Sequence, residues 1–192
     1  MWQRVESKPY HARYEWIHST KGPNEGVLEQ REVGICCRDS EGRERIETRT
    51  GSEFDRLESA EIYDPVSELE FILIGDSQVI QFSPDPSAFS AHTIGLDDGS
   101  AIVLPDVRQE RIGQYVGQKE VEGMMCNGYK IVREGRYKLE YWLSTDLEQI
   151  LRMTISTESR KSEYRVFDIH RVNSDKSIFA MPQRSQEHLI CL

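Results

Sequence analysis

The side-chain pair with the clearest capacity for acid–base chemistry is Asp168 and His170, which lie two residues apart. On a β-strand this spacing puts both side chains on one face, where they would serve as an acid–base pair or as metal ligands. No two histidines lie three or four residues apart, so the helical metal pair of an HExxH motif is absent from the sequence. A surface or pocket-rim pair is the commoner reason for such spacing, and we expect no catalysis here. The five histidines are His11, His18, His92, His170 and His188.

The four cysteines do not have the spacing of a metal site, because the sequence contains no CxxC pair. Cys36 and Cys37 are adjacent, so on a strand their side chains would point to opposite faces. Cys126 has no neighbouring histidine or cation to lower its pKa, and we interpret it as a buried strand cysteine rather than a nucleophile. Buried thiols are the first expectation for all four, Cys191 included, and one or two disulfides in an oxidising compartment are the alternative.

Motifs for phosphate, dinucleotide or acyl-enzyme chemistry are missing, because the sequence lacks Walker, GxGxxG and GxSxG patterns. Carboxylates are abundant, but they alternate with cations, as on a solvated face. We therefore predict a protein that is not an enzyme and that uses neither a cofactor nor a metal.

Composition limits the partners. The 192 residues fit one domain and carry a net charge of −9, which repels the phosphate backbone of nucleic acids. The longest apolar runs have four residues, as in 71–74, far short of the roughly 20 residues of a membrane-spanning helix. Residues 1–6 lack the apolar core of a signal peptide, so we expect either a cytosolic protein or one whose signal has been removed.

Alternation of polar and apolar residues is the dominant pattern and predicts a mainly β chain. In 43–50 every odd-numbered residue is charged and Ile46 lies among the even ones, so we expect a half-buried strand whose charged face is solvated. In 137–144 the odd-numbered residues are apolar, and Tyr141 should face away from Trp142.

Turn residues recur roughly every 10 residues, which is the spacing of an antiparallel meander. Helical signals are few: a turn or two at 55–60, a short helix near 87–92, and a capped helical turn at 145–148 with only a few residues before the next strand. The span 83–109 is rich in proline and is expected to be an insertion or a lid over a single β domain of residues 1–192. A meander of this length protects its edges by closing into a barrel, forming a sandwich or curling around a helix.

Three stretches in the second half of the chain carry a family resemblance. They are 117–130, with its turn glycines, 140–147, which contains Trp142, and 163–182, which ends in a Phe-x-x-Pro sequence at Pro182. Their order and spacing resemble the LolA-like superfamily of outer-membrane lipoprotein carriers, which includes acidobacterial envelope proteins of unknown function.

This resemblance implies a strongly curved antiparallel sheet that forms an unclosed barrel with one or two short helices. It also implies a protein of the periplasm or cell envelope whose signal peptide has been removed, whereas a native start at Met1 would place it in the cytoplasm. The carriers of this superfamily hold acyl chains on the concave face of the sheet.

We therefore expect a non-enzymatic binding protein that holds a lipid or a lipoprotein acyl chain, with another envelope protein as a further partner. We expect it neither to bind nucleic acid nor to span a membrane. An envelope scaffold with a filled core and no small-molecule ligand is the alternative, and an enzyme built on Asp168 and His170, or on Cys126, is a third hypothesis. The residues expected to line the apolar site are Tyr14, Trp16, Val33, Ile35, Ile46, Phe71, Leu73, Leu139, Tyr141, Met153 and Ile155.

Overall fold

The computed structural model describes residues 8–22, 26–51, 54–67, 69–75, 78–82, 93–95, 101–103, 113–180 and 190–191. In these ranges the chain is almost entirely antiparallel β-sheet, and its one helical segment is the 3-10 turn η1 (Lys176–Phe179). The prediction of a mainly β chain is confirmed. The helical turn predicted at 55–60 is wrong, because a strand begins at Arg56 and runs through this segment.

Most of the excursion 83–109, including the helix predicted near 87–92, lies outside the described residues. The described part of the excursion is a small antiparallel hairpin of β7 (Thr93–Gly95) and β8 (Ala101–Val103).

The chain divides into two compact units, and three long strands pass through both of them. Unit 1 consists of residues 1–14, 33–89 and 168–192, and unit 2 consists of residues 15–32 and 90–167. The shared strands are β1 (Tyr10–Lys21), β2 (Val27–Arg38) and β13 (Arg160–His170). That residues 1–192 form one domain stays a prediction.

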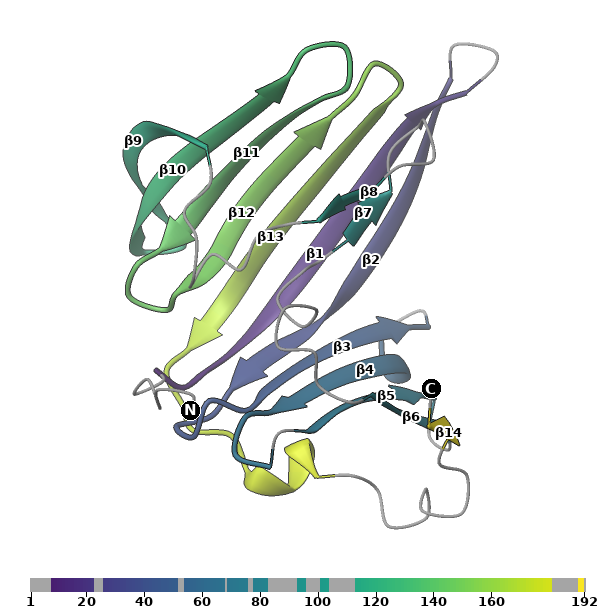
Figure 1. Cartoon of the computed structure of the whole chain (residues 1–192), viewed down its shortest axis with the longest axis vertical. Helices are drawn as coiled ribbons and strands as arrows, with labels where there is room; N and C mark the ends of the chain where they lie inside the picture. Colours follow the sequence, from purple (N-terminus) through teal and green to yellow (C-terminus); the bar gives the residue numbers. More distant parts are fainter. Residues whose placement is uncertain are drawn as a thin grey trace. The chain divides into compact units, whose positions relative to one another are not determined.

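Unit 1 adds an antiparallel meander to its parts of the long strands (Figure 1). In hydrogen-bonded order the strands are β1, β2, β3, β4, β5 and β6, and β14 pairs with β6 in parallel. The added strands are β3 (Glu44–Thr50), β4 (Arg56–Asp64), β5 (Leu69–Ile74), β6 (Gln78–Phe82) and β14 (Ile190–Cys191).

Unit 2 contains the second meander, in which β13, β12, β11, β10 and β9 lie side by side after β2 and β1. These strands are β9 (Gln114–Val121), β10 (Met124–Arg133), β11 (Tyr137–Ser144) and β12 (Gln149–Ser156). Glu122 and Gly123 both have positive φ, at 50° and 74°, and form the two-residue turn between β9 and β10. The sequence predicted this hairpin turn.

The sheet is not closed into a barrel, because its hydrogen-bonded order ends at β14 and at β9, which do not pair with each other. The predicted unclosed antiparallel sheet is therefore confirmed.

The face of β3 that was expected to be solvated is the covered one. Glu47 is only 9% exposed, and the side chains of Arg43 and Arg45 are 12% and 11% exposed. Arg45 and Glu47 lie opposite Ile62 and Ala60 of β4, so the charged residues share their face with the apolar core of unit 1. The expectation failed because alternation separates two faces of a strand but does not determine which face other segments cover.

Candidate functional site

Five of the predicted lining residues come together in unit 2. Four of them, with exposures of 0% to 3%, belong to a buried cluster, and Trp16 packs against it at partial exposure. We call this group the unit 2 cluster. Its buried members are Tyr129, Leu139, Tyr141, Leu143, Met153 and Ile155, and its partly buried members are Trp16, Ile131, Tyr137, Ile150 and Tyr164.

Aromatic side chains cross the unit 2 cluster in one row. Tyr115, Tyr129 and Tyr141 face one another on successive strands, and Met153 and Tyr164 continue the row. Tyr129 and Tyr141 are stacked with ring centroids 5.2 Å apart, and Tyr115 meets Tyr129 edge-on at 5.9 Å. The sequence analysis did not include Tyr115, Tyr129 or Tyr164 among the site residues, because cross-strand register decides which aromatics meet.

The row ends on β1 at Trp16, next to polar side chains. Trp16 packs edge-on against Tyr164 at 5.4 Å and stacks on His18 at 5.2 Å. His18 Nδ1 lies 2.9 Å from Ser162 Oγ. Burial lowers the pKa of His18 below its usual 6.5, with Arg160 acting in the same direction and Glu32 opposing it.

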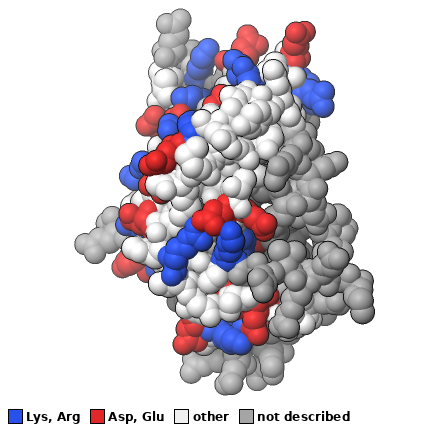
Figure 2. All heavy atoms as spheres, turned by 90° about the vertical axis from the view of Figure 1, so that its left-hand side faces the viewer, with Lys and Arg blue, Asp and Glu red and all other residues white. Residues whose placement is uncertain are grey.

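The other end of the row, at Tyr115, is exposed. Tyr115 is 54% exposed, and Met125 on the neighbouring strand is 56% exposed. Val116 and Val132 are also exposed, but they belong to the opposite face, where a Cβ added at Gly128 would meet Val116. Figure 2 views the molecule from the side where Figure 1 draws β9, and it shows an uncharged area between side chains of both charges.

The opposite face of unit 2 is built differently. Trp142 lies over Gly128, where an added Cβ would come within 2.7 Å of the indole ring, and its Nε1 donates to Glu140 at 3.0 Å. Lys119 Nζ lies 3.6 Å from the centre of the Trp142 ring. The predicted separation of Trp142 from Tyr141 is confirmed.

In unit 1 the predicted residues divide between the two faces of the sheet. Phe71 and Leu73 belong to the buried cluster that also includes Phe179 of η1, and Val33 and Ile35 lie on the same face, opposite Arg49 and Glu47. Ile46 pairs with Cys36 and points to the other face. Tyr14 is also on that other face, where it covers Gly34. That any of these residues contacts a ligand stays a prediction.

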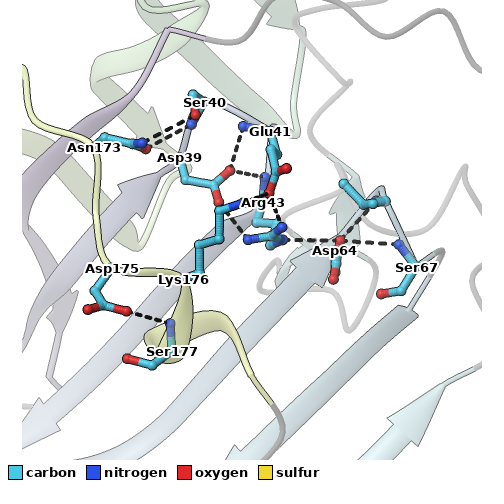
Figure 3. Close-up of polar contacts among 11 residues, drawn as sticks. Asp39, Ser40, Glu41, Arg43, Asp64, Ser67, Asn173, Asp175, Lys176 and Ser177 are labelled. Carbon is cyan, nitrogen blue, oxygen red and sulfur yellow. Dashed lines mark hydrogen bonds and ion pairs between the residues drawn. The ribbon is translucent and has the colours of Figure 1, made fainter.

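Figure 3 shows a cluster of charged and polar side chains at the β2–β3 turn of unit 1. Asp39, which is 1% exposed, accepts from the backbone N–H groups of Glu41 and Arg43 at 2.8 Å and 2.9 Å and from the Arg43 guanidinium at 3.0 Å. Arg43 also pairs with Glu41 and with Asp64, and Lys176 of η1 pairs with Glu41. Each of the three carboxylates is paired with Arg43 or Lys176, so the cluster fastens η1 to the turn.

The residues of the enzyme hypothesis are not arranged for catalysis. The side chains of Asp168 and Arg13 are 56% and 54% exposed and form an ion pair at 3.7 Å, and His170 is exposed. Cys126 is 1% exposed, and burial raises its pKa, which disfavours the thiolate that a nucleophile needs.

Neither a metal site nor a membrane-spanning helix is present in the described ranges. They contain no group of three or more His, Cys, Asp or Glu side chains that would hold a metal ion. No helix in the same ranges is long and apolar enough to cross a membrane.

Comparisons with known proteins place the chain by its fold. No protein-family model matches it, and no curated protein matches it in sequence. An uncharacterised conserved protein from Thermus thermophilus has a similar structure, with a TM-score of 0.57, 10% identity, and coverage of 99% of this chain and 93% of that one.

Two further solved structures are similar at lower TM-scores. The LolA superfamily protein NE2245 from Nitrosomonas europaea gives 0.47 at 10% identity, covering 93% of this chain and 92% of that one. The MucA/MucB complex of Pseudomonas aeruginosa gives a TM-score of 0.47 at 14% identity. The match covers 92% of this chain and 57% of that one. At these identities the likeness concerns the fold alone. The predicted antiparallel, unclosed fold is confirmed, and the chain is similar in fold to these structures.

Proposed function

We propose that this is a non-enzymatic cell-envelope protein that binds an apolar chain, either a lipid or a lipoprotein acyl chain, on the unit 2 cluster. The observation that carries the proposal is the continuous row from the exposed Tyr115 to the half-buried Trp16. The resemblance of residues 115–182 to lipoprotein carriers supports an acyl chain as the ligand.

The dimensions of the row suit a long chain. From β9 to β1 it crosses five strand spacings of about 4.8 Å, or roughly 24 Å. Each methylene group removed from water contributes about 0.8 kcal/mol, so a long hydrocarbon chain binds without many polar contacts. The half-buried members of the cluster, such as Tyr137 and Ile131, offer apolar surface to such a chain.

The two faces of unit 2 each carry one tryptophan, which provides an internal control. Trp16 packs on the unit 2 cluster, and Trp142 lies on the opposite face. Two variants are made in a Trp2→Phe background. Trp142→Phe leaves Trp16 as the one fluorescent tryptophan, and Trp16→Phe leaves Trp142 in that role. A fatty acid brominated along its chain should quench Trp16 strongly and Trp142 weakly. Equal quenching of both residues, or of neither, would contradict a chain bound on this face.

One observation favours a second function, that of an envelope protein-interaction module with a filled core. Leu139, Tyr141 and Met153 are 0%, 1% and 3% exposed, so their own packing fills the middle of the cluster. Mass spectrometry of an organic extract of the purified protein separates the two functions. A co-purified lipid supports the carrier, whereas absence of lipid together with no uptake of fluorescent fatty acid supports the module.

A further inference from the structure

The Trp16 end of the unit 2 cluster contains a hydrogen-bond donor that the described part of the protein leaves unused. Trp16 Nε1 is buried and has no partner among the described residues. An indole N–H only donates, so the group that would satisfy it must be an acceptor. Buried donors in folded proteins nearly always have a partner, so an unsatisfied one points to an acceptor outside the described residues.

Polar groups lie beside the Trp16 ring. The His18 ring stacks on the Trp16 indole and is held by the contact of its Nδ1 with Ser162 Oγ. Arg160 of β13 and Glu32 of β2 are the charged residues that act on His18, with opposite signs. Ser162 lies opposite Ile155 in the sheet, so these polar groups directly border the apolar part of the cluster.

We propose that this polar end binds the carbonyl or carboxylate oxygen at the head of an acyl chain, while the hydrocarbon lies along the unit 2 cluster. The inference rests on the proposed function and adds a preference for the head group. Trp16 Nε1 donates to the oxygen, and His18 and Ser162 form the polar wall around it. An acceptor fits this place and a cationic head does not, because the unused group is a donor.

Low polarity increases the effect of such a contact. The indole N–H of Trp16 is buried, and a hydrogen bond is stronger in such surroundings than in water. A hydrogen bond to a charged acceptor changes affinity by roughly tenfold or more, so the head-group preference is measurable.

Three ligands with the same chain and different heads test the inference. Laurate carries a carboxylate, methyl laurate carries a neutral ester carbonyl, and dodecyltrimethylammonium carries a cation with no acceptor. Each is titrated calorimetrically below its micelle concentration. We expect at least one of the two acyl ligands to bind roughly tenfold more tightly than the cation, although the net charge of −9 favours the cation. Preference for laurate over its ester identifies a carboxylate site, and similar affinities identify a carbonyl site.

Variants assign the preference to the Trp16 end. Trp16→Phe keeps an aromatic ring but removes the N–H donor. In this variant the ratio of the affinity for the acyl ligand to the affinity for the cation should approach the value expected when the protein recognises the hydrocarbon alone. Trp142→Phe, on the opposite face, should leave the ratio unchanged. Ser162→Ala is the second variant if Trp16→Phe does not fold, and it should reduce the ratio by a smaller factor.

The outcomes separate the two proposals. Equal affinity for all three ligands in the native protein overturns the head-group inference and leaves the apolar carrier standing. A preference that survives in both Trp16→Phe and Ser162→Ala also overturns the inference. Failure of every ligand to bind overturns the proposed function and the inference together.

Discussion

The ring of Tyr14 on β1 covers Gly34 on β2, and the Tyr14 hydroxyl lies 3.1 Å from the Thr48 hydroxyl on β3. Gly34 pairs with Thr48 across β2 and β3, so the tyrosine bridges the pair from above. Glycine is required here for space: an added Cβ would come within 2.5 Å of the tyrosine ring and 1.7 Å of the Glu47 carbonyl oxygen.

Gly34→Ala should therefore destabilise the protein by about 2 to 3 kcal/mol, because backbone and ring must both move. The free energy of unfolding in urea measures this loss, and insoluble expression would be its extreme form. Gly26→Ala is the matched control, because an added Cβ there meets no atom within 4 Å. Equal stabilities of the two variants would show that the close approach at Gly34 is relieved at no cost.

Glu47 holds two arginines on the covered face of β3. Its carboxylate accepts from Arg45 at 2.7 Å and from Arg49 at 2.5 Å. Glu47→Gln should cost about 2 to 4 kcal/mol of unfolding free energy, because it leaves two half-buried cations without their counter-charge. The exposed pair of Glu163 and Lys161 is the control, and Glu163→Gln should cost less than about 1 kcal/mol. Similar losses in the two variants would contradict a structural role for the buried carboxylate.

The adjacent thiols of β2 should not react in the native protein. Cys36 and Cys37 are 1% and 2% exposed, and burial is the main cause that raises their pKa values to about 12 and about 11. At about pH 8 both remain protonated, so a thiol reagent should modify them only after unfolding. Peptide mapping of protein labelled before and after denaturation measures the difference. Rapid native labelling of either cysteine would show that this part of unit 1 opens readily.

Stability should fall as the solution becomes mildly acidic, in part because of His18. Burial lowers the pKa of His18 in the folded protein below 6.5, so the unfolded chain takes up its proton first as the pH falls. This contribution to stability is present above about pH 6.5 and is lost as the pH falls toward the folded-state pKa. Urea midpoints at two pH values on either side of this window measure the slope. His18→Gln should reduce the slope relative to that of the native protein.

The sequence predicted the local structure well because alternation and turn chemistry depend on neighbouring residues. The strand faces of 137–144 follow from a period of two, and the turn at Glu122 and Gly123 follows from its turn residues. The helical turn predicted at 55–60 failed because pairing with the neighbouring strands β3 and β5 outweighs a weak local signal.

Tertiary structure alone decided which faces are covered and which distant residues meet. Arg45 donates to the carbonyl oxygen of Ile178 at 2.6 Å across a separation of 133 residues, so η1 turns a charged strand face into a covered one. His18 and Ser162 meet across 144 residues and make one end of the apolar cluster polar. Period and propensity describe a strand and its two sides, whereas burial depends on segments that the chain brings back from far along its length.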